Sequence, residues 1–503
     1  MRREFERVTP ESVGIPSAAV QRLLDRLDES NTEMHGLMVM RHGKVCAEGW
    51  WTPYAPGLRH GLQSLSKTYA ATAVGLLYTE GLIRLDERVI DIFPEDAPAQ
   101  PSENLKKLTV RDVLCMGCGM DTMPAPSEHW IRDFLHTPVN HEPGSCFMYN
   151  SVGSSMLAAM VVKKTGQSLQ EYLTPRLYEK LGMDPASTSW YCMPDGVECG
   201  GAGMFSTTEN NLRLMKLYAD GGQWEGERIL AEDFVRLATS SQNDSSTESK
   251  GNPEAYDNFV GYGFQIWMCR PRGVYRADGA MGQFSVVVPD KDMIISVNET
   301  ATGAHWAQNT LDILWQFLGE IPEEEDPLPE DPRVSDALRR RLSALALPTP
   351  PFAPNSSFVS QVSGQWFGLE QGSFTLRQRI GGILSGTPVG GEITRFRLEF
   401  AYGSVTLTAL EDGKEVQYRV ATDGSRALNL VETTHLPISQ LYLHGWWSEE
   451  DTFSIALRWV ETCFEDRLDL HFTDDGVEIR RESVIGGFGP MTEKGETLLA
   501  KRC

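Results

Sequence analysis

A serine and a lysine three residues apart, Ser64 and Lys67, stand at the start of a long apolar stretch of this chain. Residues at positions i and i+3 share one face of a helix, so we expect the hydroxyl and the amine to be neighbours. The residues that follow, 69–78, are rich in Ala and Leu and carry no charge, which predicts a helix buried on all sides. Burial and the positive end of the helix dipole both disfavour a charged lysine. The pattern therefore indicates a neutral amine beside a hydroxyl, that is, a base beside a nucleophile.

Two further segments could supply the other groups that such a nucleophile needs. Tyr149 follows a Pro-Gly turn, where its phenol can reach into a cleft. Residues 275–283 lie between two expected strands and are rich in small side chains, so they can bring a backbone N–H close to a developing oxyanion. Each segment alone is also compatible with a structural role, as a core tyrosine or a bulged edge strand. Their order after the Ser-Lys pair favours a catalytic site.

Composition and charge exclude several classes of partner. The chain has 503 residues and a formal net charge of −23. Such a surface repels phosphate backbones and anionic lipid, so we expect no nucleic acid and no membrane as partners. The N-terminus, residues 1–7, is charged and lacks an apolar signal core, and no uncharged run reaches the roughly 18 apolar residues of a spanning helix. We therefore expect a cytoplasmic protein.

The cysteines and histidines do not predict a metal site or a disulfide framework. The nine cysteines are odd in number and scattered, which is typical of reduced thiols. Cys115 and Cys118 form a Cys-x-x-Cys pair, but no second pair follows at a spacing that would complete a zinc site. The ten histidines show no ligand spacing. The oligomeric state stays open at this point.

The composition and the pattern of expected helices and strands divide the chain into three parts. Residues 1–320 carry strand-like segments at both ends and helical segments between them, which predicts one α+β unit. Residues 321–355 are rich in Pro and acids and contain a short helical stretch, as in a stiff linker. Residues 356–503 alternate strand-like runs with Asp-Gly turns, which predicts an antiparallel barrel or sandwich. The expected elements are a hairpin over 36–50, helices from 64, over 108–116, within 130–183 and over 208–220, and strands over 263–267, 284–288, 293–297, 396–400, 404–410, 416–420, 453–460, 467–472 and 477–484.

Residues of about 10–315 resemble the serine β-lactamase-like family, and within it the class C β-lactamases, related esterases, D-aminopeptidases and 6-aminohexanoate-dimer hydrolases. The resemblance implies an α/β sandwich, in which an antiparallel sheet is flanked by helices and the active site lies beside a helical subdomain. The C-terminal part resembles the lipocalin-like domains that some members carry. The segments that carry the resemblance are, in chain order, 64–67 (Ser-Leu-Ser-Lys), 81–86, 108–114, 143–149, 201–208 and 275–283.

Carried over residue by residue, the resemblance implies a role for each catalytic position. Ser64 attacks the carbonyl and becomes acylated, Lys67 takes its proton, and Tyr149 passes a proton to the leaving group and later activates water. The backbone N–H groups of Ser64 and Ala280 form the oxyanion hole. The resemblance implies no metal or organic cofactor, and as partner a small-molecule ester, amide or lactam.

Two departures from the family pattern concern the substrate-binding positions. Ser151 stands where the family has an amide that contacts substrate, and Ala277 stands where it has Lys or His, followed by Asp278 and Gly279. An alanine cannot hold a substrate carboxylate, and the neighbouring aspartate repels it. We therefore expect an esterase or amidase that acts on small substrates and hydrolyses β-lactams weakly or not at all.

Two alternatives stay open, a β-lactamase or D-peptidase that anchors the carboxylate through Arg276 or Arg272, and a non-catalytic penicillin-binding-like sensor. A second Lys-Thr-Gly sequence, residues 164–166, matches a box found beside Ser-x-x-Lys in penicillin-recognising enzymes, but it ends a helical run. We expect Gly166 to cap a helix instead. Residues 240–257, rich in Ser, Asn and Asp, have the composition of a mobile loop that shapes access to the site.

Overall fold

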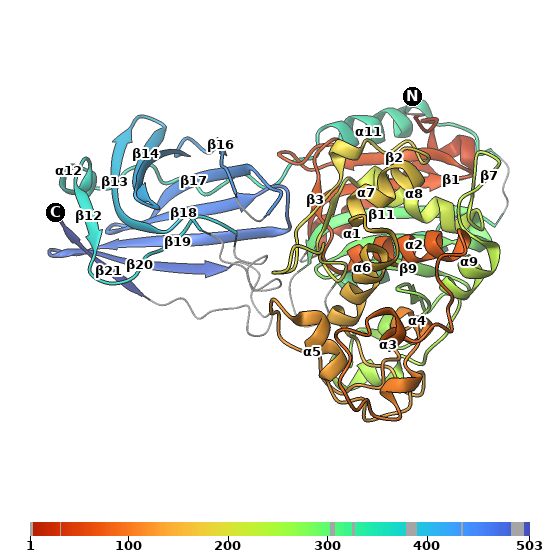
Figure 1. The fold of residues 1–503 in the computed structure, drawn as a ribbon. Helices are drawn as coiled ribbons and strands as arrows, with labels where there is room; N and C mark the ends of the chain where they lie inside the picture. The colour runs from red at the N-terminus through yellow and green to blue at the C-terminus, as the bar shows by residue number, and fades with distance from the viewer. Residues whose placement is uncertain are drawn as a thin grey trace. The chain divides into compact units, whose positions relative to one another are not determined.

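The structure, a computed structural model, describes residues 4–30, 32–301, 307–323, 327–378, 390–433, 436–483 and 497–503. The chain forms two compact units, the first extending to Ala346 and the second beginning at Leu347 (Figure 1). The boundary therefore lies later than the expected end of the first domain at residue 320. None of the helices in the described ranges combines the length and the apolar character that crossing a bilayer requires.

The first unit extends beyond residue 320 because the helix expected in the linker packs onto it. Helix α11 (Pro332–Ser343) carries Arg341, whose guanidinium donates to Asp25 at 2.6 Å and to Asp28 at 2.8 Å. Both acids lie on α1 (Ser17–Glu29). The acidic, Pro-rich composition of this region indicated a solvated linker, but Arg341 of α11 pairs with two acids of α1.

A six-stranded antiparallel sheet forms the centre of the first unit, with strand order β2-β1-β11-β10-β9-β8. The expected hairpin over 36–50 is confirmed, with Arg41 opposite Lys44 at the turn. The N-terminal hairpin joins the C-terminal meander through β1 and β11, so the sheet is completed by segments far apart in sequence. The strands are β1 (Thr32–Arg41), β2 (Lys44–Trp50), β8 (Trp267–Met268), β9 (Tyr275–Gly279), β10 (Gln283–Val288) and β11 (Met293–Ala301).

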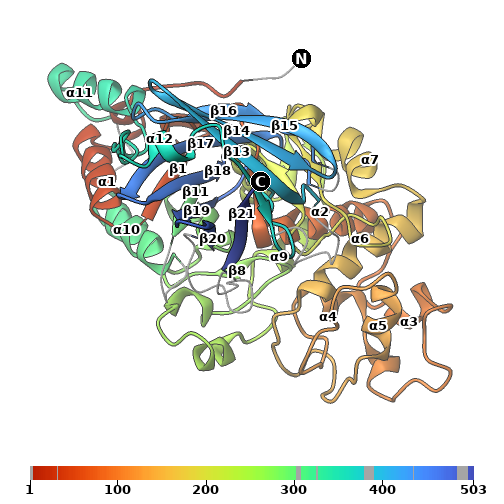
Figure 2. The same cartoon turned by 90° about the vertical axis from the view of Figure 1, so that its left-hand side faces the viewer.

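Helices cover this sheet on both faces, as the expected α+β architecture requires. Helices α1 and α10 lie on one side of β1 and β11, and α2 and α6 lie on the other side (Figure 2). Helix α8 packs on β1 closely enough that a Cβ at Gly36 would lie 2.8 Å from Thr208 Oγ1. The helices are α2 (Ser66–Thr79), α3 (Val89–Ile92), α4 (Val110–Leu114), α5 (Trp130–His136), α6 (Ser151–Thr165), α7 (Leu169–Leu173), α8 (Thr208–Ala219), α9 (Glu232–Ala238) and α10 (Gln308–Gly319).

Local signals located several of these helices correctly. Thr207 caps α8 by accepting from Asn210 N, and Thr109 caps α4 in a capping box with Asp112. Residues 66–77 of α2 are buried without exception, as the uncharged stretch predicts. The strand expected over 263–267 is wrong except at Trp267, because Gln265 adopts a positive φ of 55° and interrupts it.

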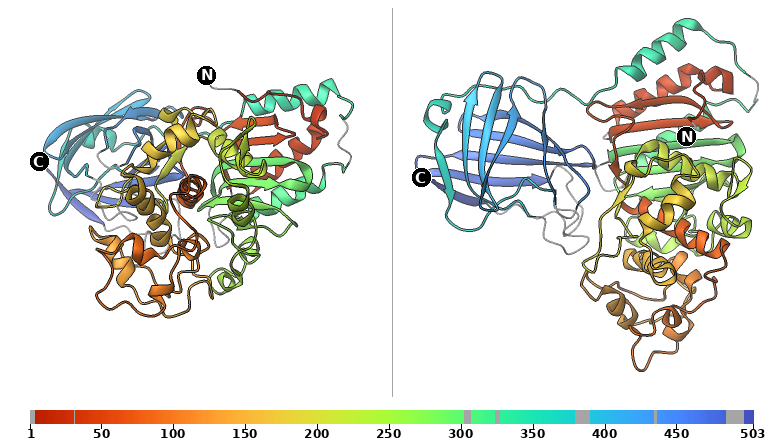
Figure 3. Two further views of the ribbon diagram at one scale, coloured as in Figure 1. Left: turned by 45° about the vertical axis from the view of Figure 1, so that its right-hand side comes forward. Right: turned by 45° about the horizontal axis from the view of Figure 1, so that its top comes forward.

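The described residues of the second unit form a barrel of ten strands. The strands follow the order β15-β14-β13-β12-β21-β20-β19-β18-β17-β16, each antiparallel to the next, and a parallel pairing of β15 with β17 closes the barrel. The barrel can be seen in Figure 3. Along β19 buried and half-buried positions alternate, so one face fills the barrel. The strands are β12 (Trp366–Leu369), β13 (Ile393–Ala401), β14 (Ser404–Glu411), β15 (Lys414–Ala421), β16 (Ala427–Leu430), β17 (Gln440–Glu449), β18 (Thr452–Trp459), β19 (Phe464–Phe472), β20 (Gly476–Ser483) and β21 (Leu498–Arg502).

Candidate active site

Ser64 and Lys67 lie one helical turn apart where a 3-10 turn, Gln63–Leu65, leads into α2. The Lys67 amine donates to Ser64 Oγ at 3.0 Å and to the carbonyl oxygen of Gly201 at 2.6 Å. Only 1% of Lys67 is exposed, whereas Ser64 is half-buried and reachable. The Gly201 carbonyl fixes the direction of the amine, which leaves its lone pair, once the amine is neutral, available to the serine hydroxyl.

The surroundings of Lys67 favour its neutral form. Burial lowers its pKa to about 7, and the nearby Cys199 thiol and Asp278 carboxylate oppose this effect only in part. A lysine whose pKa lies near 7 is neutral in a large fraction of molecules at neutral pH. It can then accept the proton of a neighbouring hydroxyl, as a general base must.

Tyr149 is held beside this pair by an aromatic cluster. Its ring stacks on Trp267 with centroids 5.7 Å apart and an interplanar angle of 18°, and it packs against buried Phe147 and Tyr262. The Lys67 amine lies 4.8 Å from the centroid of the Tyr149 ring. Burial raises the pKa of the phenol, and hydrogen bonding by Ser64 opposes this rise without cancelling it. The phenol is therefore protonated at neutral pH, and can donate a proton.

The backbone of strand β9 lies directly against residues 62–65, which carry the candidate nucleophile Ser64 and are called the nucleophile turn. A Cβ at Gly279 would lie 2.1 Å from the carbonyl oxygen of Leu62 and 3.1 Å from the nitrogen of Leu65, so only glycine fits there. Gln63, immediately before Ser64, has a positive φ of 50°, a conformation that costs energy in a residue with a side chain. The chain thus brings the end of β9, where Ala280 follows, against the turn that carries Ser64.

The other expected substrate-binding residues differ in accessibility. Ser151 is the first residue of α6, and a Cβ at Gly201 would lie 2.4 Å from its carbonyl oxygen, which places it beside the acceptor of Lys67. Asp278 is partly exposed, whereas Ala277 is fully buried. The side chain of Ala277 therefore offers no surface to a ligand, and Asp278 is the side chain of this strand that can contact one.

The second Lys-Thr-Gly sequence is confirmed as a helix end. Helix α6 stops at Thr165, and Gly166 follows with a left-handed φ of 71°. Its lysines pair with acids of the helical subdomain, Lys163 with Glu95 and Lys164 with Glu87. Neither belongs to the site around Ser64.

Two groups of the site were missed from the sequence. The carbonyl of Gly201 lies in a run of small residues, 200–203, but nothing in the run indicates that Lys67 is its partner. Glu248, in the loop over residues 240–257, acts electrostatically on Tyr149 and raises the pKa of its phenol, as Asp278 does. This loop is anchored at both ends, by Asn243 to the carbonyl of Cys115 at 3.0 Å and by Asp257 to Gln308. Among the described residues, no group of three or more His, Cys, Asp or Glu side chains could hold a metal ion.

The beta-lactamase family model matches residues 6–314, more than half of the chain and nearly all of the first unit. The chain belongs to the beta-lactamase family. A 6-aminohexanoate-dimer hydrolase from Paenarthrobacter ureafaciens is 26% identical over 294 residues, 54% of this chain and 74% of that protein. A putative D-alanyl-D-alanine carboxypeptidase from Escherichia coli K12 is 23% identical over 253 residues, 39% of this chain and 58% of that protein.

Two solved structures of similar fold each cover about three fifths of the chain. EstCE1, described as a hydrolase with promiscuous acyltransferase activity, has a TM-score of 0.50 at 17% identity and covers 59% of this chain and 98% of its own. A putative beta-lactamase from Bacteroides dorei DSM 17855 has the same TM-score at 14% identity, over 61% of this chain and 98% of its own. At these identities they show the fold alone.

The neutral fraction of Lys67 predicts how activity depends on pH. Because its pKa is lowered to about 7, the amine is charged below that pH and gains its free lone pair as pH rises through it. We expect kcat/KM for phenyl butyrate to rise about tenfold per pH unit below pH 7 and to level off above it. A pH-stat assay that follows acid release measures this profile. A rate that stays flat from about pH 5 to about pH 9 would show that Lys67 is not the base.

Proposed function

We propose that this protein is a serine hydrolase that forms an acyl-enzyme on Ser64 and acts as an esterase or amidase on small substrates. The observation that carries the proposal is the buried Lys67 amine 3.0 Å from Ser64 Oγ. Burial lowers the pKa of that amine to about 7, so a base able to accept the serine proton adjoins the hydroxyl.

The proposed reaction assigns one step to each group. Ser64 Oγ bonds to the substrate carbonyl carbon while its proton passes to Lys67, and the carbonyl oxygen becomes an oxyanion held by the N–H groups of Ser64 and Ala280. The bond to the leaving group then breaks, and Tyr149 donates the proton that the leaving group needs. The phenol then recovers a proton from Lys67, which returns the amine to its neutral form. In the second half of the reaction water attacks the acyl carbon and gives up a proton to the same groups. The bond between the acyl carbon and Ser64 Oγ then breaks, and Ser64 Oγ takes that proton back.

The proposal favours esters and amides over β-lactams because Ala277 stands where the family has the cation that holds a substrate carboxylate. Arg276, one of the two arginines suggested as a carboxylate anchor, is fully buried and donates to Asp278 at 2.7 Å. Arg272 is exposed, but it lies before the start of β9. The end of β9 that contacts the nucleophile turn is the opposite one, at Gly279, so Arg272 is separated from Ser64 by the length of the strand. Neither arginine can hold a carboxylate beside Ser64. One relative is named a 6-aminohexanoate-dimer hydrolase and another a putative D-alanyl-D-alanine carboxypeptidase, and these names support the amidase part of the proposal.

A comparison of two chromogenic substrates tests the proposed function. We expect kcat/KM for p-nitrophenyl butyrate to exceed that for nitrocefin by about 100-fold or more, since nitrocefin carries a carboxylate that meets Asp278 instead of a cation. Mass spectrometry of the quenched ester reaction should show a butyryl group on Ser64. Efficient nitrocefin turnover would overturn the ranking. If a fluorophosphonate also gave no adduct on Ser64, the result would favour the non-catalytic sensor.

A further inference from the structure

Strand β9 presents two opposite charges on one face, at positions two residues apart. Arg276 Nε donates to Asp278 Oδ2 at 2.7 Å. Their exposure differs, because 1% of the Arg276 side chain and 20% of the Asp278 side chain is accessible. In the described part of the chain no group donates to the second carboxylate oxygen, Oδ1, of Asp278. One oxygen of this carboxylate is therefore held, and the other is available to a ligand.

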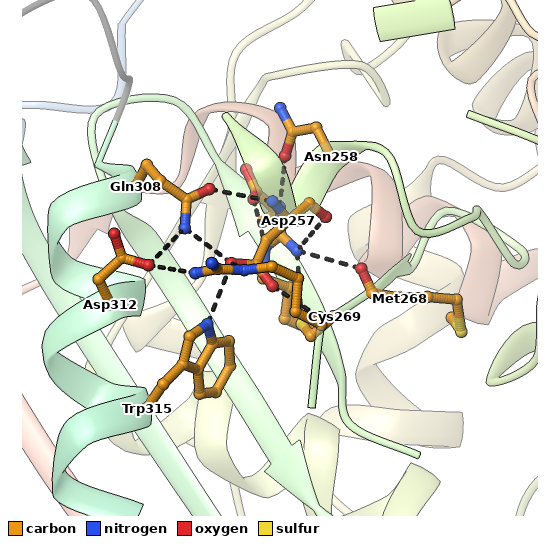
Figure 4. Close-up of polar contacts among 10 residues, drawn as sticks. Asp257, Asn258, Met268, Cys269, Gln308, Asp312 and Trp315 are labelled. Atoms are coloured by element: carbon orange, nitrogen blue, oxygen red, sulfur yellow. Dashed lines mark hydrogen bonds and ion pairs between the residues drawn. The ribbon is translucent and has the colours of Figure 1, made fainter. Parts of the chain in front are cut away.

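A buried network holds Arg276 in place behind Asp278. The guanidinium of Arg276 also donates to the carbonyl oxygen of Asp257 at 3.1 Å and to Asn258 Oδ1 at 2.6 Å. Asp257 in turn accepts from Gln308 at 2.7 Å and from Trp315 at 3.0 Å. Figure 4 shows Gln308, Asp312 and Trp315 projecting from one helix toward Asp257. These bonds hold Arg276 rigidly, so it orients Asp278 and is not free to move toward a substrate.

When the Lys67 amine is neutral, the charged groups around Asp278 leave an excess of negative charge at the site. Two guanidinium groups, of Arg270 and Arg276, are linked to three carboxylates, of Asp257, Asp278 and Asp312. Burial raises the pKa of Asp278, and Arg276 and Lys67 lower it. Glu248 adds a further carboxylate near the Tyr149 phenol.

Asp278 is also close to the reacting groups. Its carboxylate acts electrostatically on the Lys67 amine and on the Tyr149 phenol. Gly279, the next residue, lies against the nucleophile turn. A group bound by Asp278 would therefore sit near the carbonyl that Ser64 attacks.

We propose that Asp278 is the substrate anchor and that it binds an ammonium group, so that the preferred substrates are esters or amides with a free amine near the scissile bond. This inference rests on the proposed function and specifies its substrate class. Asp278 Oδ1 accepts a hydrogen bond from the ammonium group. Arg276, bonded to Oδ2, keeps the carboxylate in the orientation that allows this bond. The Asp278 carboxylate repels a substrate that carries a carboxylate of its own.

Matched esters that differ only in charge test the proposal. Phenyl esters of alanine and β-alanine are compared with those of isobutyric and butyric acid, in which a methyl group replaces the ammonium. We expect the wild-type protein to prefer at least one ammonium ester over its methyl analogue by about 10- to 100-fold in kcat/KM. Asp278→Asn, which keeps the shape and removes the charge, should bring the ratio of kcat/KM for the ammonium ester to kcat/KM for its methyl analogue close to one, and this ratio within one variant does not depend on how the change alters the basal rate.

Asp290→Asn is the matched control, because Asp290 is exposed and lies just after the far end of β10 from Gly279. This variant loses the same charge and should keep the preference. If Asp278→Asn does not fold, the salt dependence of the wild-type protein gives a second readout, since added NaCl should reduce the rate of the ammonium ester and not of its analogue. Equal kcat/KM for the charged and neutral esters in the wild-type protein would overturn the inference. The proposed function would fail separately, by the absence of a Ser64 adduct with the neutral esters.

Discussion

Replacing Ser64 by alanine is expected to lower kcat/KM for p-nitrophenyl butyrate by about 10,000-fold or more, because the reaction loses its nucleophile. Ser64 is half-buried, and its hydroxyl bonds to Lys67, so the melting temperature should stay within about 2 °C of the wild-type value. Steady-state kinetics and mass spectrometry of the quenched reaction measure the two effects. The acyl-enzyme seen with the wild-type protein should be missing from the variant.

Ser249→Ala provides the control for this change. Ser249 lies in the exposed part of the loop over 240–257, where its hydroxyl donates to the carbonyl of Ser246 at 2.7 Å. The control should retain wild-type kcat/KM and still label with a fluorophosphonate at Ser64. Persistent hydrolysis and an acyl adduct in Ser64→Ala would mean that another residue is the nucleophile, and the proposed function would have to be withdrawn.

Replacing Lys67 by methionine is expected to lower kcat for the same ester by about 1,000-fold or more and to remove the rise in activity through pH 7. Methionine fills the buried space of the lysine stem and takes away the amine that accepts the Ser64 proton. The carbonyl of Gly201, which accepts from this amine at 2.6 Å, loses its partner, so some stability is lost as well. Kinetics across the pH range measure the loss of activity and of its pH dependence, and the melting temperature measures the loss of stability.

Lys164→Met is the matched control, since Lys164 belongs to the second Lys-Thr-Gly sequence and pairs with Glu87. It should lower stability slightly and leave both kcat and the pH profile unchanged. A Lys67→Met variant with near wild-type kcat and an unchanged profile would contradict the role of Lys67 as base. The rise in activity below pH 7 would then reflect the deprotonation of another group.

Parts of the fold that depend on neighbouring residues could be predicted well. The hairpin of β1 and β2, the helix expected over 208–220, which is α8, and the end of α6 at Gly166 each arise from a few adjacent side chains. The family match over residues 6–314 also confirms the expected fold of the first unit. The strand expected at 263–267 failed because Gln265 bonds to distant helices, through its backbone N–H to Leu114 and its carbonyl to Thr68.

Other expectations depended on which groups a side chain contacts in the folded protein, and these contacts could not be predicted from the sequence. The helix after residue 332 had a linker-like context, and its contacts with α1 and β2, among them the ion pairs of Arg341 and the packing of Leu342 against Gly49, place it in the first unit. Arg276 was a candidate for anchoring a substrate carboxylate, but in the structure its guanidinium is bound by Asp257, Asn258 and Asp278. Charge alone does not show whether an arginine faces a ligand or the interior.

The spacing of Ser64 and Lys67 was enough to predict that they are neighbours, because three residues of helix set their separation whatever surrounds them. The sequence also indicated a buried lysine, since the stretch that follows carries no charge. The packing of distant segments, in contrast, selects the group that orients that lysine and the charged side chain of β9 that is accessible. The Gly201 carbonyl lies 134 residues from Lys67 and Asn258 lies 18 residues from Arg276, and such contacts form through packing that leaves no local spacing in the chain.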